Sequence, residues 1–180
     1  MIRKAELKDL EFLIKTDLKD EGITITSETL KIHGELEEHR KKILNFVTDE
    51  NYGAFIFEKS SNDILGLIMY SIENRDVEYP WKNIYKQIDR SLFQENGLFV
   101  AIFQLWVDPN HRRRGIATRL KQEVEEEAER RGINLIYTHT EEKNLHVVEL
   151  NKKLGYEEVR RGEIWDDIIR VSLIKQLDRL

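Results

Sequence analysis

The sequence has no cysteine and only two prolines among its 180 residues. Without cysteine, the chain cannot form a disulfide framework, a thiolate metal site or a cysteine nucleophile. Its five histidines show no metal-ligand spacing, so we expect no metal site. The N-terminal residues lack the apolar core of a signal peptide, and the chain has no run of about 18 apolar residues. We therefore expect a cytoplasmic protein without a membrane partner.

Neither sign of charge dominates the chain. It carries 29 lysines and arginines against 34 aspartates and glutamates, which gives a formal net charge of −5. This balance argues against a nucleic-acid-binding surface that covers the whole molecule. A hydrophobic content of 40% in 180 residues is enough for one core, so we predict a single domain over residues 1–180.

Residues 98–120 combine the signals of a strand, a turn and the start of a helix. A nearly continuous apolar run over 98–107 predicts a buried central strand. Three arginines and Gly115 then precede a helix whose apolar stripe is Ala117, Leu120, Val124 and Ala128. The first N–H groups of a helix have no internal partner and carry partial positive charge. With the arginines beside them, they predict a binding site for a diphosphate group.

The arginine-rich loop matches neither of two common phosphate-binding motifs. It lacks the Gly-Lys-Ser/Thr of a Walker A loop, and it has one of the three glycines of a dinucleotide-binding fingerprint. It resembles the pantetheine–pyrophosphate loop of the GNAT superfamily of acyl-CoA-dependent N-acyltransferases, whose pattern is Gln/Arg-x-x-Gly-x-Gly/Ala. The pattern here is Arg112-Arg113-Arg114-Gly115-Ile116-Ala117, preceded by Val107-Asp108-Pro109.

A later segment resembles a second signature of this family, Asn-x-x-Ala-x-x-Leu-Tyr-x-x-Leu-Gly-Phe. The matching residues are Asn144, Leu150, Leu154 and Gly155, with Tyr156 in the place of the phenylalanine. Val147 replaces the alanine, which is a small packing change. Asn151 replaces the tyrosine that in this family usually protonates the departing thiolate, and this replacement affects the expected mechanism.

The resemblance implies an α+β GNAT fold, with a mixed, mostly antiparallel sheet of about seven strands flanked by helices. Sequence patterns predict strands at 1–5, 53–58, 64–70, 98–107, 133–140, 157–161 and 168–174. They predict helices at 8–20, over about twenty residues after a cap at Ser27, from Gly115 to Gly132, and from Asn144 to Leu154.

Residues 74–97 are the least family-like part of the chain, and we predict a helical insertion there. Pro80 suits the first turn of a helix. The residues that would share one face are Trp81, Ile84, Tyr85, Ile88 and Leu92. That face either packs on the sheet or serves as a lid over the acceptor or as a contact in a homodimer.

The resemblance also implies that acetyl-CoA is the acetyl donor, and it assigns residues to each part of that molecule. The main chain of Leu105, Trp106 and Val107 would pair with the pantetheine arm, and one N–H there would hold the developing oxyanion. Asn144 would bond the same arm, and Asn151 the sulfur. The pyrophosphate would lie on Arg112, Arg113, Arg114, Gly115, Ile116, Ala117 and Thr118.

Attack of an amine on a thioester needs a base, because an alkyl amine is protonated at neutral pH. Some family members carry a glutamate on the central strand, but Ala101-Ile102-Phe103 has none. His139 on the neighbouring strand is the candidate base, since histidine ordinarily titrates near pH ~6.5; Glu141 and Glu142 are alternatives. Tyr156 or Tyr137 could supply the acid that Asn151 cannot.

Three functions follow from these patterns. The first is an acetyltransferase of the EC 2.3.1 class that acetylates a primary amine of a small molecule or peptide. The second is a non-catalytic acyl-CoA-binding protein with the GNAT fold, suggested by Asn151. The third is a nucleic-acid-binding module built on residues 111–114, which the net charge and the lack of interleaved aromatics disfavour. The similarity to the ribosomal-protein N-terminal acetyltransferase branch is general, and the sequence does not identify the acceptor.

Overall fold

The computed structural model describes residues 1–20, 33–79 and 83–177. The strands there are β1 (Ile2–Lys4), β2 (Tyr52–Ser60), β3 (Asp63–Asn74), β4 (Leu98–Val107), β5 (Leu135–Glu141), β6 (Glu157–Gly162) and β7 (Arg170–Gln176). The α-helices are α1 (Leu10–Asp20), α2 (His33–Thr48), α3 (Ile116–Arg130) and α4 (Leu145–Lys153). Short 3₁₀ helices are η1 (Leu7–Asp9), η3 (Asn83–Gln87), η4 (Arg90–Leu92) and η5 (Pro109–His111).

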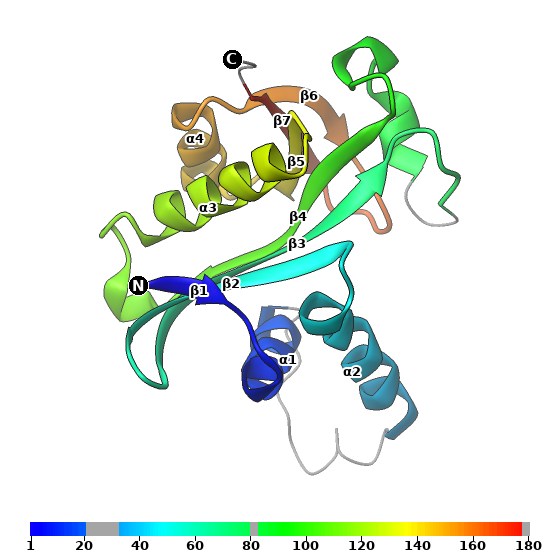
Figure 1. Ribbon diagram of the computed structural model, residues 1–180. Helices are drawn as coiled ribbons and strands as arrows, with labels where there is room; N and C mark the ends of the chain where they lie inside the picture. Colours follow the sequence, from blue (N-terminus) through cyan, green and yellow to red (C-terminus); the bar gives the residue numbers. More distant parts are fainter. Residues whose placement is uncertain (21–32, 80–82, 178–180) are drawn as a thin grey trace. The chain divides into compact units, whose positions relative to one another are not determined.

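The strands form one seven-stranded sheet in the order β1-β2-β3-β4-β5-β7-β6 (Figure 1). β4 and β5 run parallel, with Val100 opposite Ile136 and Ala101 opposite Tyr137. The pairs β1–β2, β2–β3, β5–β7 and β6–β7 are antiparallel. The predicted mixed, mostly antiparallel sheet with flanking helices is therefore confirmed, and β4 begins and ends at the predicted residues.

The chain divides into two compact units, each built from two separate stretches. Unit 1 contains Met1–Ser71 and Gln104–Lys121, and unit 2 contains Ile72–Phe103 and Gln122–Leu180. The prediction of a single domain stays a prediction.

Unit 1 holds two helices against a hairpin. α2 packs against β2, and α1 packs against α2. The predicted hairpin of β2 and β3 turns at Asn62, which adopts a left-handed backbone with φ of 66°. His39 Nε2 of α2 lies 2.5 Å from Asp17 Oδ2 of α1, which joins the two helices. Ser27, the predicted cap of the second helix, lies outside the described residues.

A glycine in unit 1 allows β3 to contact the first turn of α3. A Cβ atom on Gly66 would lie 2.8 Å from Cγ2 of Ile116, a distance that real Cβ atoms essentially never show. It would also lie 3.2 Å from Leu120 Cδ1 and from the carbonyl oxygen of Trp106. Gly66 therefore fixes where the helix begins relative to the hairpin, and this determines the position of the loop before the helix.

Unit 2 has an aromatic core between its strands and the segment before β4. The ring of Tyr85 meets Phe99 edge-on at 4.8 Å and Tyr137 at 5.1 Å between centroids. Edge-to-face pairs at this distance contribute beyond their buried area. Tyr85 and Phe99 belong to one buried cluster with Ile84, Ile88, Phe93, Ala101, Leu135, Tyr137 and Ile174.

The segment at residues 74–97 differs from the prediction of one amphipathic helix. Its described part, 74–79 and 83–97, contains two short 3₁₀ helices, η3 and η4, and no α-helix. Three apolar residues of the predicted face, Ile84, Tyr85 and Ile88, are nevertheless buried. Pro80 and Trp81 lie outside the described residues.

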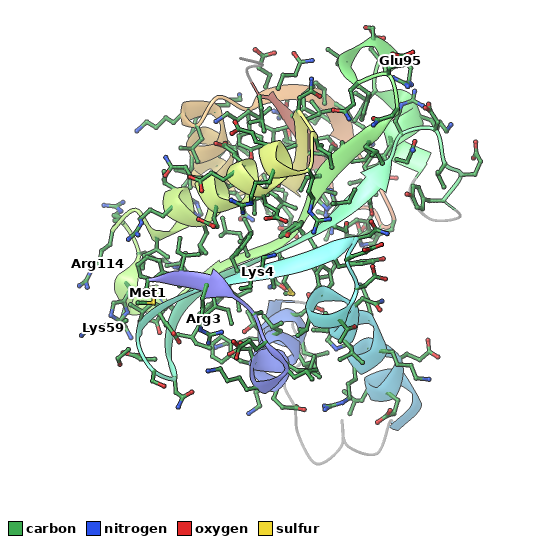
Figure 2. All side chains as sticks on the ribbon, viewed as in Figure 1. Met1, Arg3, Lys4, Lys59, Glu95 and Arg114 are labelled. Carbon is green, nitrogen blue, oxygen red and sulfur yellow. The ribbon has the colours of Figure 1, made fainter. Side chains whose placement is uncertain are left out.

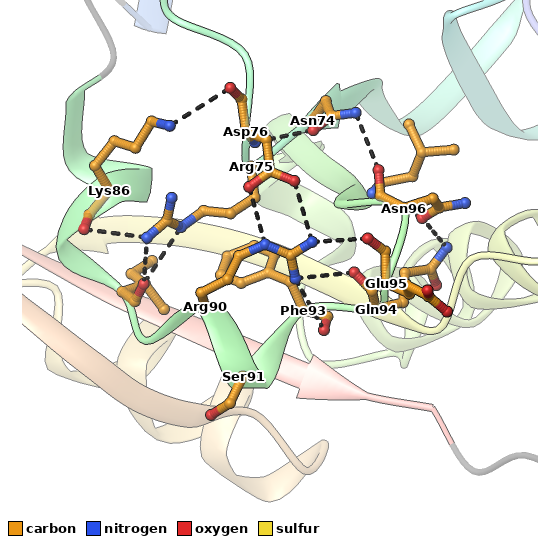
Figure 3. Close-up of polar contacts among 12 residues, drawn as sticks. Asn74, Arg75, Asp76, Lys86, Arg90, Ser91, Phe93, Gln94, Glu95 and Asn96 are labelled. Atoms are coloured by element: carbon orange, nitrogen blue, oxygen red, sulfur yellow. Dashed lines mark hydrogen bonds and ion pairs between the residues drawn. The ribbon is translucent and has the colours of Figure 1, made fainter.

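Two arginines determine the path of this segment, as Figure 3 shows. Arg75 donates to the carbonyl oxygens of Ile88 at 3.0 Å and Lys86 at 3.2 Å. Arg90 pairs with both carboxylate oxygens of Asp76 and donates to the carbonyl oxygens of Phe93, Gln94 and Glu95. Because side chains satisfy these carbonyls, the backbone does not need helical hydrogen bonds.

Candidate active site

The turn between β4 and α3 is held in shape by Asp108. The Asp108 carboxylate accepts hydrogen bonds from the Asn110 backbone N–H at 2.8 Å and from the His111 ring, whose Nδ1 lies 3.3 Å away. These bonds, with a smaller contribution from Arg112, hold the pKa of Asp108 below its usual range. The backbone N–H of Asp108 donates to Leu65 O at 2.8 Å, which ties the turn to β3.

The loop that follows opens the N-terminus of α3. Arg113 has φ of 62° and Gly115 has φ of 77°, so the backbone enters the left-handed region twice in three residues. The Arg119 N–H donates to Gly115 O at 3.0 Å, which makes Gly115 the cap of the helix. The N–H groups of Ile116, Ala117 and Thr118 then precede the first intrahelical bond and have no acceptor in the helix. Such N–H groups form a site for an anion.

Positive charge gathers around this open end of the helix. Arg112, Arg113 and Arg114 are all exposed. A cavity of about 340 Å³ adjoins the loop and is lined by Met1, Phe57, Glu58, Lys59, Leu65, His111, Arg114 and Ile116. Figure 2 shows Arg114 and Lys59 on the same side of unit 1, near Met1. The carboxylate of Glu58 is already bound by Arg3 at 2.9 Å, so its charge is compensated.

The last residues of β4 offer main-chain groups. Leu105, Trp106 and Val107 are half-buried. The Trp106 ring meets Phe12 of α1 edge-on, with 5.5 Å between the centroids. The Trp106 side chain therefore takes part in packing, and the three residues lie beyond the two pairs that join β4 to β5.

The two asparagines assigned to acetyl-CoA lie on α4 and differ in burial. Asn144 caps the helix through its backbone, but its half-buried side chain makes no capping hydrogen bond. Asn151 is 2% exposed, and its Oδ1 has no hydrogen-bond partner within the described residues. A buried carboxamide oxygen without a partner costs about 1–3 kcal/mol. Both side chains therefore retain hydrogen-bonding capacity.

His139 lies in a chain of hydrogen-bonding groups in unit 2. Its Nδ1 is 3.1 Å from Tyr137 Oη, which in turn is 3.0 Å from Ser172 Oγ. Its ring meets the exposed ring of Trp165 edge-on at 5.5 Å. The Trp165 ring also lies 4.1 Å below the guanidinium of Arg170, which pairs with Asp166. The structure thus brings the predicted base together with Tyr137, one of the two predicted acids.

Tyr156, the other predicted acid, is 2% exposed. Burial raises the pKa of its phenol, with a smaller contribution from Glu125. The Tyr156 N–H donates to Asn151 O at 3.0 Å. A backbone hydrogen bond therefore joins two residues of the second family signature. The ammonium of Lys175 lies 6.0 Å from the centre of the Tyr156 ring. Tyr156 therefore stays neutral at physiological pH.

The alternative bases each lie beside an arginine. The Glu142 carboxylate accepts a hydrogen bond from Arg161 at 2.8 Å. Glu141 is half-buried at the end of β5, opposite Arg170 of β7. His139 has the hydroxyl of Tyr137 as its partner, and that hydroxyl is in turn bonded to Ser172. His139 therefore stays the leading prediction.

Two neighbours of His139 were not predicted from the sequence. Ser172 contacts Tyr137 because β7 places it opposite His139. Trp165 reaches His139 from the segment between β6 and β7. Strand alternation shows that Ser172 lies on one face of its strand, but the register between two distant strands cannot be derived from a single sequence.

The described residues contain no group of three or more His, Asp or Glu side chains placed to hold a metal ion. No helix among them is long and apolar enough to cross a membrane.

The loop, the sheet and the two signatures agree with one family, and a comparison of the sequence with family models decides the point. The model described as "Acetyltransferase (GNAT) family" matches residues 20–156. The chain belongs to this family. The match covers both of the signatures recognised in the sequence. A comparison with curated protein sequences gives no match.

Solved structures share the fold of this GNAT protein at low sequence identity. Arabidopsis thaliana NAA60 in complex with acetyl-CoA is 18% identical, covers 98% of this chain and 97% of its own, and has a TM-score of 0.73. The ribosomal-protein-S18-alanine N-acetyltransferase of Escherichia coli is 13% identical, with coverage of 100% and 95% and a TM-score of 0.64. The NatC complex bound to Gag peptide and CoA is 17% identical, with coverage of 99% and 98% and a TM-score of 0.59.

Proposed function

We propose that this protein transfers an acetyl group from acetyl-CoA to a primary amine. The amine belongs to a small molecule or to a peptide. The observation that carries the proposal is the loop at residues 112–118. Its two left-handed residues, open N–H groups and three exposed arginines suit the pyrophosphate of a CoA thioester.

The rest of the donor has candidate partners on the same chain. The main-chain groups of Leu105, Trp106 and Val107 would pair with the pantetheine arm as an added strand would. Asn144 would bond the arm through a side chain that the helix does not use as a cap. Asn151 would donate a hydrogen bond from its side-chain amide N–H to the sulfur, while its Oδ1, which has no partner within the described residues, remains able to accept one.

The chemistry is a direct acyl transfer. The amine nitrogen attacks the thioester carbonyl, a C–N bond forms, and the C–S bond breaks as CoA leaves as a thiolate. The amine is an ammonium ion at neutral pH and gives up two protons in all. His139 is the proposed acceptor of the one removed before attack, and the second, released as the amide forms, passes to the thiolate or to water. A thiol with a pKa near ~8.5 gives a thiolate that is a good leaving group, so the C–S bond breaks without obligatory protonation of the sulfur. Tyr156, neutral and buried, is the proposed donor of a hydrogen bond to the departing sulfur, and no dedicated acid is required.

Two solved relatives support an amine of a protein chain as one acceptor class. The Arabidopsis NAA60 structure contains a bisubstrate analogue, and the NatC complex contains a peptide. Their identity to this chain is 17%, so they support the fold and suggest acceptors to test. A panel of peptides with free N-termini, lysine, polyamines and aminoglycosides covers the classes of primary amine.

The first experiment is a thermal melt with acetyl-CoA, with ATP as a control for general phosphate binding. Ligand at 100 times its Kd adds about 2.7 kcal/mol. For a chain of this size, each kcal/mol raises Tm by roughly 2–4 °C. We expect a rise of several degrees with acetyl-CoA and little change with ATP. No rise at millimolar acetyl-CoA would reject the donor site.

A charge-matched pair of variants tests the loop itself. Arg112, Arg113 and Arg114 changed together to glutamine should abolish the Tm rise with acetyl-CoA. The control changes Lys15, Lys19 and Lys41 to glutamine, because these lysines are exposed on the helices of unit 1. The control should keep the full rise. Equal losses in both variants would indicate a general effect of charge and would contradict a specific site.

The second candidate function is an acyl-CoA-binding protein without turnover. Asn151 favours it, because this residue stands where the family usually has its acid. Release of free CoA in the presence of the amine panel separates the two functions. Acetyl-CoA binding without CoA release for any amine would support the second function.

A further inference from the structure

The group that bonds His139 is a buried hydroxyl backed by a second hydroxyl. Tyr137 is 1% exposed and Ser172 is 0% exposed, whereas His139 is half-buried. Tyr137 Oη lies between the other two groups, at 3.0 Å from Ser172 Oγ and 3.1 Å from His139 Nδ1. These distances suit hydrogen bonds. The chain of groups therefore runs from the interior of unit 2 to the edge of the imidazole.

The sheet itself fixes this arrangement. Tyr137 and His139 are two residues apart on β5, so they share one face of the sheet. Ser172 pairs with His139 in the antiparallel register of β5 and β7, which places it on the same face. The Tyr137 ring is locked by edge-on contacts with Tyr85 and Phe99. The hydroxyl of Tyr137 is thus held by the core, independently of His139.

A pair of hydroxyls differs from a carboxylate as a partner for histidine. Each hydroxyl can donate one hydrogen bond and accept others. When His139 is protonated, Nδ1–H can donate to Tyr137 Oη, and Tyr137 can donate to Ser172. When Nδ1 carries a lone pair, Tyr137 can donate to it, and Ser172 can donate to Tyr137. Nδ1 therefore has a partner in both charge states.

We propose that Tyr137, backed by Ser172, is a positioning residue that holds His139 through Nδ1 in both of its charge states while the imidazole takes up the proton of the acceptor amine. The proposal rests on the proposed acetyl transfer, for which His139 is the base. It assigns a role to two buried residues that neither touch the donor nor take the proton themselves.

Two charged groups act on the phenol of Tyr137: Arg160 of β6 lowers its pKa and Glu73 of β3 raises it, each by less than burial and the Ser172 hydrogen bond do. Glu73 also accepts a hydrogen bond from Tyr85, whose ring meets that of Tyr137 edge-on. Arg160 of β6 donates to Gln87 and to Glu163 O. Arg170 of β7 pairs with Asp166 and covers Trp165, whose other contact is the His139 ring. The described partner of Nδ1 is the hydroxyl of Tyr137 and not one of these charges.

Loss of the Tyr137 hydroxyl should destabilise protonated His139 more than neutral His139. A hydrogen bond from a charged group is about twice as strong as one between neutral groups. In Tyr137→Phe the titration midpoint of the His139 ring should therefore fall by about 0.5–1 pH unit. Ser172→Ala removes the acceptor behind Tyr137 and should shift the midpoint in the same direction by less.

The experiment measures His139 directly by NMR, with the imidazole signals followed against pH in the full chain. Tyr85→Phe is the matched control, because it removes another buried phenol hydroxyl from the same aromatic cluster without touching His139. We expect an unchanged midpoint in Tyr85→Phe. Acetyl transfer by Tyr137→Phe should show an acid limb displaced to lower pH, a kcat reduced about tenfold and an unchanged KM for acetyl-CoA.

Two results would overturn the inference. One is a His139 midpoint in Tyr137→Phe that equals the wild-type value. The other is an equal displacement in Tyr85→Phe, which would show a general effect of core disruption. The NMR titration does not depend on turnover, so it tests the hydroxyl chain separately. Absence of acetyl transfer by the wild-type protein would reject the proposed function and not the hydrogen bonds.

Discussion

The first turn of α3 rests directly on Gly66, where Ile116 Cγ2 would approach a Cβ atom to 2.8 Å. The same helix turn presents the open N–H groups after Gly115. A residue on β3 therefore helps to position the loop that we propose as the acetyl-CoA site. The contact lies entirely within unit 1.

Gly66→Ala should weaken both stability and donor binding. The added methyl group must displace Ile116 or the strand, which costs about 1–3 kcal/mol. Displacement of the first turn should raise the Kd for acetyl-CoA about tenfold. Denaturant unfolding and calorimetric titration measure the two effects. Gly53→Ala is the control, because its Cβ would clash with the Tyr70 ring at 2.3 Å without involving α3. It should lose stability but keep donor affinity.

Gly115→Ala should weaken binding through backbone strain alone. Gly115 has φ of 77°, and a Cβ atom added there would have nothing within 4 Å. Alanine at this position costs about 1–2 kcal/mol or relaxes the loop away from its shape. Gly132 ends the same helix with φ of 69° and an equally open position. Gly132→Ala should cost similar stability and leave the Kd for acetyl-CoA unchanged. Equal effects of both variants on Kd would contradict a role for the loop's shape.

Arg3→Gln should lower stability at neutral pH by about 1–3 kcal/mol. Arg3 bonds Asp9 at 2.8 Å and Glu58 at 2.9 Å. Burial works to raise the pKa of Asp9, but hydrogen bonds from Arg3 and from the Glu6 backbone outweigh it, so this pKa lies below its usual range. The bond from Arg3 also lowers the pKa of Glu58.

These depressed pKa values give the Arg3 effect a pH dependence. Stabilisation from a carboxylate with a lowered pKa is complete above its unfolded value near ~4 and is lost as pH falls through its folded value. The difference between wild type and Arg3→Gln should therefore shrink below about pH 3–4. Urea unfolding at pH 7 and pH 3 measures it. Lys4→Gln, an exposed neighbour on β1, should show little difference at either pH.

Asn151→Leu should stabilise the protein and impair acetyl transfer. The side chain is 2% exposed, and Oδ1 lacks a partner within the described residues. Leucine removes that polar group and keeps the same number and branching of heavy atoms, which should raise the free energy of unfolding by about 1 kcal/mol. If the carboxamide contacts the donor, kcat/KM should fall about tenfold. A stabilised variant with wild-type kinetics would show that the carboxamide has no part in the reaction.

Asn151→Tyr tests whether the enzyme lacks a needed acid. We expect no strong gain in turnover, because a thiolate is a good leaving group and the buried site has little room for the larger side chain of tyrosine. Turnover and acetyl-CoA affinity are measured together. A strong rise in turnover at unchanged affinity would contradict catalysis without a dedicated acid.

The parts of the fold that the sequence predicted are those with local signals. β4 follows from an unbroken apolar run, and α3 follows from a glycine and a helical stripe. The loop between them was predicted because Asp108, Pro109 and Gly115 act on their own backbone. The hydrogen bonds around His139 were not predicted, since Tyr137 bonds its Nδ1 and Ser172 reaches Tyr137 through the register of two distant strands.

The segment at 74–97 shows where periodicity misleads. Ile84, Tyr85 and Ile88 have helical spacing and are buried, yet η3 and η4 are short 3₁₀ helices. Asp89 caps η4 by accepting from the Ser91 N–H at 3.0 Å, so the chain starts a new element inside the predicted helix. The hydrogen bonds that Arg75 and Arg90 donate to backbone carbonyl oxygens are the second reason why this segment is not one helix. Periodicity measures which side chains face inward and does not detect side chains that bind the backbone.

The two arginines have a consequence for how this segment can change in evolution. In an α-helix every residue helps to fix the backbone, because each peptide N–H bonds the carbonyl oxygen of the residue four positions earlier. Here Arg75 and Arg90 bind five carbonyl groups between them. Outward-facing positions such as Val77 and Glu95 are therefore open to substitution, while the spacing between the arginines and their carbonyls is not. Relatives should tolerate new side chains in this segment far better than insertions or deletions.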